Sequence, residues 1–480
     1  MSSQCVARDA PTPTRLQSSA MRAVVLCCAV AGCFRPSPDP GAPCAANGDC
    51  PDGLSCSADQ RCVEAASDGL DACGDAVCVG DELVGCGSAV TCEYGCAEGA
   101  SIRAVPAGAR CRALVPSNGI SPALLAGATA DVTMVDLDFD TDDGAITLNG
   151  TMVRPAGEGV IGGIRFALVD GLAVWAARSW TSSGASSEDW KARGANPIVL
   201  YAATTITVSG LVDVGAQGMT GGPGGVSGNP SVTPSGCRGR AGRSNATVGS
   251  AFGEGGGGGG GLHDGGDGGP STIANPTGVG GTTCAAPSAI PLRGGSSGGH
   301  GGQDVGNAGG GGGGAIMLVA MDAVTITGIV ASPGAGGMSA TTGSGGGGGG
   351  GSGGAILVEA PRVNIAGSLS ANGGAGAAPA GGTDGGRGSL SSTTAAGGGG
   401  FSCVATAGGT AVIRRGGGGG TGTVAPTNGA TCTVTGAAGT TSSQGGGGGG
   451  AAGRIVIRTL DGGITGVASP AATIEPAIVE

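Results

Sequence analysis

Two stretches of the chain, Ala315–Ala340 and Ala355–Ala380, repeat the same short pattern of apolar residues around a glycine. When Gly328 and Gly367 are aligned, aliphatic residues fall four and two positions before each glycine and again two positions after it. This period-two alternation predicts two short strands that meet at a bend, where the glycine leaves room that a side chain would occupy. The second half of the chain is therefore limited to a β structure built of similar units.

Two further copies of the pattern occur. One starts at Ile198 and has Gly210 at the predicted bend, and the other starts at Ile455 and has Gly466 there. In the last copy Gly462 replaces an aliphatic residue, as expected for a terminal repeat that faces solvent. We therefore count four copies, of which Ile198 begins the first.

One such unit is too small to bury its apolar edge, whereas stacked units can bury it, with Ile326 above Ile365 in an aliphatic ladder. The pattern predicts an all-β domain, a parallel β-helix (solenoid-like) with glycine-rich insertions. An antiparallel sandwich is the alternative, but its hairpins need regular turns of about two to five residues, which are missing here.

Glycine supplies 111 of the 480 residues and proline 25, a share typical of low-complexity chains. However, 39% of the residues are hydrophobic and 12% are charged, which argues against disorder of the whole chain. The polyglycine runs have two interpretations, flexible linkers or close-packed extended helices with three residues per turn. Because only 2% of the residues are aromatic, we expect aliphatic ladders rather than large rings in the core.

The amino-terminal region predicts export. Met21 and Arg22 precede a short apolar run that ends in Val30-Ala31-Gly32-Cys33. This ending resembles a bacterial lipobox, in which the cysteine is lipidated and becomes the first residue of the mature chain. We therefore expect upstream sequence and a lipoprotein signal peptide in 1–32, a lipid on Cys33 and a proline-rich tether in 33–43. An ordinary cleaved signal, with Cys33 paired elsewhere, is the alternative.

The cysteine count fits a set of disulfides. If Cys5, Cys27 and Cys28 are removed and Cys33 is acylated, 18 − 4 = 14 cysteines remain, an even number. Ten of them define a predicted disulfide-rich region, 44–115, ahead of the repeat domain, 116–480. Zinc is the alternative there, but each of the first four cysteines is separated from the next by five intervening residues, and no histidine is near. These ten are Cys44, Cys50, Cys56, Cys62, Cys73, Cys78, Cys86, Cys92, Cys96 and Cys111.

The remaining four cysteines lie in two long glycine-rich inserts between repeat copies. We expect one disulfide to close each insert, Cys237 with Cys284 and Cys403 with Cys432, because such a link removes entropy from an otherwise loose loop. For the ten cysteines of the disulfide-rich region, the spacing leaves the pairing open.

Four aspartates alternate with apolar residues and so share one face of a predicted strand. They do not match a helix-loop-helix calcium site, because the glycine and the final glutamate of that motif are misplaced. The interpretations that remain are a solvated strand face and a carboxylate site of a polysaccharide lyase or hydrolase. The four are Asp136, Asp138, Asp140 and Asp142.

Other chemistry is poorly represented. His263 and His300 are the only histidines and both lie amid glycine, so no catalytic triad, cofactor site or metal site is predicted. The net charge is −11 and Lys191 is the only lysine, which argues against nucleic acid as a partner. We predict a non-enzymatic protein.

The lipobox Cys33, the cysteine-rich region, the segment Pro116-Ser117-Asn118-Gly119 and repeats of the form Ala-Ile-x-Leu-x-Ala together resemble glycine-rich cell-surface lipoproteins of myxobacteria. The resemblance implies attachment to the outer membrane or cell surface, since Phe34 rather than an aspartate follows the lipid cysteine. It implies a membrane partner through the lipid, and surface polysaccharide or other envelope proteins as further partners. An adhesive or envelope-structural role is expected, with glycan or ice binding by flat polyglycine faces as another possibility.

Overall fold

The computed structural model describes 113–479, with short gaps, and seven short segments between 54 and 111. Within these residues the structure is almost entirely β, as predicted, and its only helix is the 3-10 helix η1 (Pro122–Leu125). Contacts divide the chain into two compact units, Met1–Cys92 with Cys96–Arg110, and Glu93–Gly95 with Cys111–Glu480. The gaps are 185–189, 229–235, 246–251, 271–277, 285–287, 303–306, 340–344, 400, 404–411, 415, 422 and 436–440; the early segments are 54–56, 62–64, 77–79, 82–85, 88–92, 96–99 and 108–111.

Short antiparallel strands make up the described part of the cysteine-rich region. Cys56 and Cys62 are opposite each other in the first hairpin. Cys78 and Cys92 are both disulfide-bonded, which agrees with the predicted disulfide-rich character. The strand groups are β1 (Leu54–Cys56) with β2 (Cys62–Glu64); β3 (Val77–Val79), β4 (Glu82–Gly85) and β5 (Ser88–Thr91); and β6 (Cys96–Gly99) with β7 (Gly108–Cys111).

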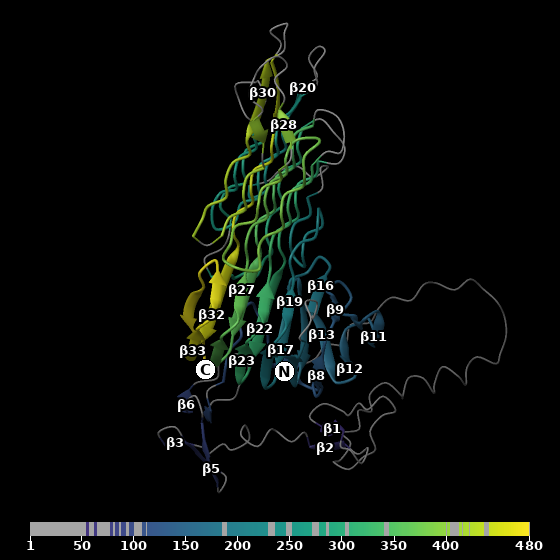
Figure 1. Cartoon of the computed structure of the whole chain (residues 1–480). Coiled ribbons are helices and arrows are strands. Elements are labelled where there is room, and N and C mark those ends of the chain that lie inside the picture. The colour runs from purple at the N-terminus through teal and green to yellow at the C-terminus, as the bar shows by residue number, and fades with distance from the viewer. Residues whose placement is uncertain are drawn as a thin grey trace, which may run out of the picture. The chain divides into compact units, whose positions relative to one another are not determined.

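The second unit contains three large sheets (Figure 1), which we call sheets I, II and III. In order across each sheet, sheet I is β12 (Gly159–Ile161), β13 (Ile164–Val169), β14 (Leu172–Ala177), β17 (Ile198–Ala202), β22 (Ala315–Ala320), β25 (Ala355–Glu359), β32 (Arg454–Thr459) and β35 (Thr473–Pro476). Sheet II is β33 (Asp461–Ile464), β26 (Arg362–Ile365), β23 (Ala323–Ile326), β18 (Thr205–Val208), β15 (Ser179–Ser182) and β8 (Asp131–Met134). Sheet III is β11 (Thr151–Arg154), β10 (Ile146–Leu148), β9 (Leu137–Asp140), β16 (Trp190–Arg193), β19 (Leu211–Asp213), β24 (Ile329–Ala331), β27 (Ser368–Ser370) and β34 (Val467–Ser469).

Each predicted copy contributes one strand to each sheet, and copies that follow one another pair in parallel. Val324 lies opposite Val363 and Ile326 opposite Ile365, so the predicted ladder register is confirmed. In the last copy Gly462 is opposite Val363, the apolar position that the sequence comparison found to be lost. Parallel pairing in all three sheets excludes the antiparallel sandwich for these copies.

The structure adds a copy that the sequence comparison missed. Strands β14, β15 and β16 pair in parallel with β17, β18 and β19, the strands of the first predicted copy. At two ladder positions this earlier copy has tryptophan, since Trp180 pairs with Ile206 and Trp190 with Val212. Because the repeat was recognised by its aliphatic residues, large rings at those positions concealed it.

The expectation of a core without large rings is wrong at this end of the domain. Trp175, Trp180, Trp190, Phe139 and Phe166 are all at most 1% exposed. They contact one another edge-on or tilted, with ring centroids 4.9 to 6.1 Å apart. The chain has few rings, but it concentrates them where the ladder begins, and the later copies use aliphatic residues as predicted.

The central strands of sheet I are buried on both faces. One face contributes to the core between the three sheets, and the other is covered by segments around Leu114, Ile120 and Leu292. As a result β14, β17, β22 and β25 consist entirely of buried residues. Burial on both faces explains why these strands are continuous apolar runs, whereas the shorter strands of sheet II alternate.

The bend glycines form a column of close backbone contacts. A Cβ atom on Gly328 would lie 2.0 Å from the carbonyl oxygen of Gly210, and one on Gly367 would lie 2.0 Å from that of Gly328. The same relation holds between Gly466 and Gly367, at 1.9 Å. The predicted reason for glycine at the bend, that a side chain has no room there, is confirmed.

The polyglycine segments form a close-packed bundle that extends from the sheets (Figure 1). Along 346–354, every third N–H group donates to the same neighbouring segment, and the glycines do not adopt a positive φ. A repeat of three residues is that of an extended left-handed helix, so the bundle matches this interpretation rather than a flexible linker. The donor and acceptor sets are Gly346, Gly349 and Ser352 with Gly302, Gly299 and Ser296; Gly347, Gly350 and Gly353 with Gly445, Gly448 and Ala451; and Gly348, Gly351 and Gly354 with Met338, Ala335 and Ser332.

Packing explains why glycine is required in the bundle. A Cβ atom on Gly348, Gly349 or Gly350 would lie 2.0 to 2.1 Å from a carbonyl oxygen, each time in a different neighbouring segment. Successive residues of a threefold helix point in three directions, so a neighbour on each side leaves no position for a side chain. The runs are therefore long because the bundle surrounds them, and the high glycine content reflects packing.

Candidate functional site

A cavity of about 540 Å³ lies where polyglycine segments lead into β25 and β32 of sheet I. Its wall includes the predicted Cys237–Cys284 disulfide, which the structure contains, with Cα atoms 5.5 Å apart. The bridge joins residues 47 positions apart in the sequence and so ties together two parts of the first insert. We take this cavity as the candidate site, because concave, largely pre-formed pockets are where small ligands bind.

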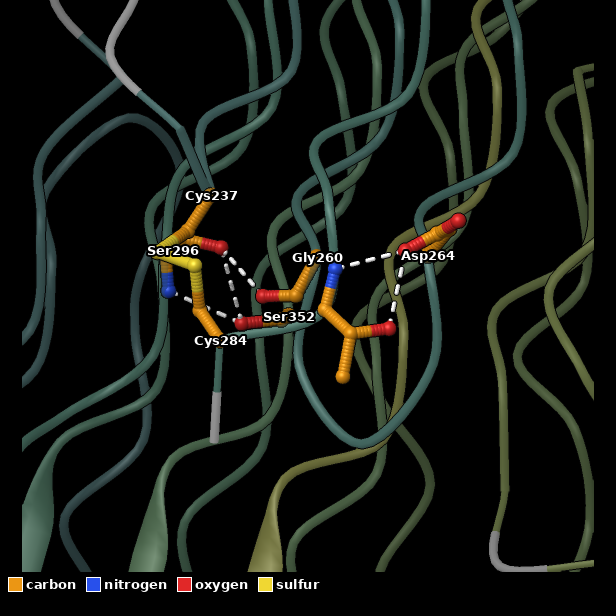
Figure 2. Close-up of a disulfide and its surroundings, with 7 residues drawn as sticks. Cys237, Gly260, Asp264, Cys284, Ser296 and Ser352 are labelled. Atoms are coloured by element: carbon orange, nitrogen blue, oxygen red, sulfur yellow. Dashed lines mark hydrogen bonds between the residues drawn. A yellow bond between two sulfur atoms is a disulfide. The ribbon is translucent and has the colours of Figure 1, made fainter. Parts of the chain in front are cut away.

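Two buried serines form the polar floor of the cavity, next to the disulfide (Figure 2). Ser296 donates its hydroxyl to the carbonyl oxygen of Gly260 at 2.5 Å, and its N–H donates to Oγ of Ser352 at 2.8 Å. The two hydroxyl oxygens are 3.3 Å apart. The backbone around them is held by the bundle, so the serine positions are fixed by hydrogen bonds from several segments.

Three arginines also line the cavity, Arg238, Arg293 and Arg454. Arg238 follows the disulfide cysteine directly, and Arg293 follows Leu292, which packs on sheet I. Burial lowers the pKa of Arg454, and the carboxylate of Glu475 acts in the opposite direction. The side chains of all three arginines are at least partly accessible.

The position of Arg454 follows from strand register. Ala315 pairs with Ala355, and Ala355 pairs with Arg454, so the three residues occupy one column across sheet I. Both alanines belong to the outer apolar face of the sheet, and paired residues of parallel strands point to the same face. When the copies are aligned, Arg454 stands where the two preceding copies have alanine. This replacement of alanine by arginine is the sequence signal for the site.

The segment Pro116-Ser117-Asn118-Gly119 is a structural clamp beside the cavity. The N–H of Ser117 donates to the carboxylate of Glu359 at 2.9 Å, and Asn118 Oδ1 accepts the N–H of Leu292 at 2.9 Å. Asn118 and Gly119 have φ values of 56° and 75°, in the region that Asn and Gly tolerate best. This motif fixes the covering segments on the outer face of sheet I.

Glu359 is a buried acid at the centre of this clamp, with an exposure of 1%. Arg458 lies 3.3 Å from it and 2.9 Å from Glu475. Burial raises the pKa of Glu359, and its hydrogen bonds from Ser117 and its contact with Arg458 oppose this effect without cancelling it.

The raised pKa of Glu359 predicts a pH-dependent stability. Protonation is easier in the folded state, so this group's contribution is fully present below the pKa of an unfolded glutamate and is lost as the pH rises through the folded pKa. In Glu359→Gln the side chain stays neutral and still accepts from Ser117, so we expect a smaller fall in the free energy of unfolding from about pH 4 to neutral pH. Denaturant titrations at several pH values measure the free energy of unfolding of the variant and of the wild type. An equally steep fall in both would contradict the role of Glu359 in the pH dependence.

Three of the four predicted aspartates have a role in a bend, a hydrogen bond or an ion pair. Leu137 and Phe139 are buried whereas Asp138 and Asp140 are partly exposed, as the alternation predicted. Asp140 pairs with Arg193 at 3.2 Å, and Asp142 accepts the N–H of Ala195 at 2.7 Å. Asp136, with a φ of 55°, directly precedes β9. None of the four lines the cavity described above.

The segment that contains His263 also has a structural role. Asp264, next to His263, accepts both the N–H and the hydroxyl of Thr283. Asp267 accepts the N–H of Gly280 at 2.8 Å. Among the described residues, no three His, Cys, Asp or Glu side chains form a group that could hold a metal ion.

Most of the other predicted site residues cannot be placed. Cys403 lies in β28 (Phe401–Cys403) and Cys432 in β30 (Thr431–Thr435), but their side chains are not described, so the predicted second disulfide stays a prediction. The same holds for the side chains of Cys56, Cys62, Cys96 and Cys111. Entirely outside the described residues are Cys33, Cys44, Cys50, Cys73 and Cys86.

No match to this chain was found among models of known families, curated proteins or solved structures. In the part of the chain that is described, no helix combines the length and apolar character needed to cross a membrane.

Proposed function

We propose that this chain is a non-enzymatic, lipid-anchored protein of the outer membrane or cell surface with an adhesive or envelope-structural role. In this proposal Cys33 carries the lipid, the cysteine-rich region follows the tether, and the repeat domain projects from the membrane. The signal-like amino terminus and the lipobox-like ending Val30-Ala31-Gly32-Cys33 are the sequence features that support the location.

We further propose that the repeat copies wind as a parallel β-helix. Each of the five copies from Leu172 onward passes through sheet I, sheet II and sheet III in that order before the next copy begins. Corresponding strands of consecutive copies pair in parallel, which is what successive turns of such a helix require. Winding of this kind makes each turn a platform for the next and leaves the connecting inserts outside.

The observation that carries the adhesive role is the polyglycine bundle. Its segments are hydrogen-bonded to neighbours along their length, and it bears hairpins at the end away from the three sheets (Figure 1). Binding residues are commonly located on loops held by a rigid scaffold. The hairpins are β20 (Ser244–Asn245) with β21 (Phe252–Gly253), β28 with β29 (Val412–Arg414), and β30 with β31 (Thr441–Gly445).

The adhesive role is tested by incubating the purified protein with envelope and matrix polysaccharides. We expect part of the polysaccharide to be retained on immobilised protein, with no release of reducing ends over time. Steady release of reducing ends would instead support the alternative of a polysaccharide lyase or hydrolase. Absence of retention on every envelope fraction, from polysaccharide to protein, would contradict the adhesive role.

Lipidation at Cys33 gives a separate prediction. In a bacterial host supplied with a labelled fatty acid, the full chain is expected to incorporate the label at Cys33. It should also fractionate with membranes, because the acyl chains of the lipid bury many CH₂ groups in the bilayer. Cys33→Ser should lose essentially all of the label, whereas Cys28→Ser, inside the predicted signal, should retain it. Equal labelling of both variants would refute the assignment of Cys33.

A further inference from the structure

The cavity beside the Cys237–Cys284 disulfide has an unusual charge. Three of its lining residues are arginines and none is an aspartate or glutamate. The whole chain has 34 acidic and 23 basic residues, so a carboxylate-free wall with three guanidinium groups is a local reversal of the overall charge. A surface of this composition attracts anions. The attraction is stronger inside a cleft, because the protein around it has a low dielectric constant and focuses the electric field of the arginines.

Arg238 and Arg293 differ from the other arginines of the domain in their partners. Arg178, Arg193, Arg362, Arg387 and Arg458 all pair with carboxylates. Among the described residues, no ion pair involves Arg238 or Arg293, and their side chains are accessible. Because the pocket lining contains no protein carboxylate, these two guanidinium groups can donate to a carboxylate of a ligand.

The shape and the remaining lining favour a sugar ring over a bare ion. A volume of about 540 Å³ lies within the range of about 300 to 1,000 Å³ seen for small-molecule pockets. Val226, Ala289 and Pro291 supply apolar surface, and Ser296, which is 7% exposed, supplies a hydroxyl group. Apolar contact with C–H groups, hydroxyls that bond to hydroxyls and a cationic side together match the chemistry of an acidic saccharide.

We propose that this cavity binds a sugar residue that bears a carboxylate or sulfate, with the oxyanion against Arg238, Arg293 and Arg454. A guanidinium group is suited to this task because its planar N–H donors match two oxygens of a carboxylate or sulfate at once. The site is composed of segments of the first insert, of the residues that lead into β25 and of the start of β32, and the disulfide holds the segment of Arg238 in place.

This inference deepens the proposed adhesive role by naming a ligand class, and it can fail separately from it. Adhesion through the hairpins at the end of the bundle would persist in variants that lack the cavity arginines. Two properties are therefore measured separately. Retention on polysaccharide reports on adhesion, and binding of short oligosaccharides in solution reports on the cavity.

The test is calorimetric titration of the purified full-length protein at low salt with four probes: an oligogalacturonate, a sulfated oligosaccharide, a neutral oligosaccharide of equal length and inorganic sulfate. We expect at least one acidic oligosaccharide to bind and the neutral one not to bind. Raising the salt concentration should weaken binding, because the contact is ionic. Equal binding of the neutral probe, binding of inorganic sulfate alone, or no binding at all would overturn the proposal.

Variants locate the binding in the cavity. Arg238→Gln and Arg293→Gln are each expected to weaken the acidic oligosaccharide about tenfold or more, as for loss of a hydrogen bond to a charged group. The matched control is Arg178→Gln, which removes a surface arginine paired with Asp131, outside the cavity. Circular dichroism and thermal melting verify that each variant is folded. Unchanged affinity in both folded cavity variants would show that binding occurs elsewhere.

Discussion

Gly350→Ala is expected to destabilise the repeat domain by roughly 3 kcal/mol or more, although it adds a single methyl group. The new Cβ would lie 2.1 Å from the carbonyl oxygen of Gly374 and 2.6 Å from its carbonyl carbon. These are backbone atoms of a neighbouring segment that is itself hydrogen-bonded on other sides, so it cannot move away without breaking further bonds. Denaturant unfolding, followed by circular dichroism, measures the loss.

The run 416–420 offers a matched comparison. A Cβ on Gly419 would be 2.1 Å from the oxygen of Gly373, whereas one on Gly418 would have its nearest contact at 3.4 Å, an ordinary van der Waals distance. We expect Gly419→Ala to be severely destabilising and Gly418→Ala to change stability by about 0.5 kcal/mol or less. Similar effects at the two positions would mean that glycine is required for its flexibility, and the close-packing explanation would be wrong.

Arg154→Met is expected to cost about 3 to 5 kcal/mol, because it leaves two buried and three partly buried carbonyl oxygens without their donor. Arg154 is 0% exposed, and its guanidinium group donates to five carbonyl oxygens at 2.7 to 3.3 Å. It also lies over the ring of Phe166, at 5.5 Å from the centroid. The residue closes the end of the core where the aromatic cluster lies.

Tryptophan fluorescence is a suitable probe for this variant, since Nε1 of Trp175 and the guanidinium of Arg154 donate to the same carbonyl oxygen, that of Gly144. Arg154→Lys should also be strongly destabilising, because an ammonium group has only three donors and lacks the planar fork. The control is Arg165→Met. In the wild type the guanidinium group of Arg165 donates to a single carbonyl oxygen, that of Ala126, near the surface. A loss no larger than that of the control would contradict the role of Arg154 as a buried structural cation.

Much of the repeat domain could be predicted because its units are marked by side chains. Ile326 and Ile365 were aligned from spacing alone, and they are partners in sheet II. Alternation works in this way because it is a local property, since neighbouring residues of a strand point to opposite faces. Spacing alone does not reveal the copy at β14 to β16, because Trp180 and Trp190 fill ladder positions that are aliphatic in the next copy.

The candidate site could not be predicted in the same way. Arg238, Arg293 and Arg454 are separated by up to 216 positions in the sequence (454 − 238) and meet only because three polyglycine segments pass the same end of sheet I. Only Arg454 had a local signal, the alanine column that it interrupts. The pairing of Cys237 with Cys284 was predictable because each insert contains two cysteines.

The sequence by itself determined the all-β class, the register of four copies and the need for glycine at their bends, because each follows from alternation along a few residues. The tertiary structure decided which segments surround each polyglycine run and where the cavity lies. A run of identical glycines has no side chains to encode a partner or a register. Its neighbours are set by the strands at its ends, such as β25 and β32, and by threefold hydrogen bonding once those strands have stacked.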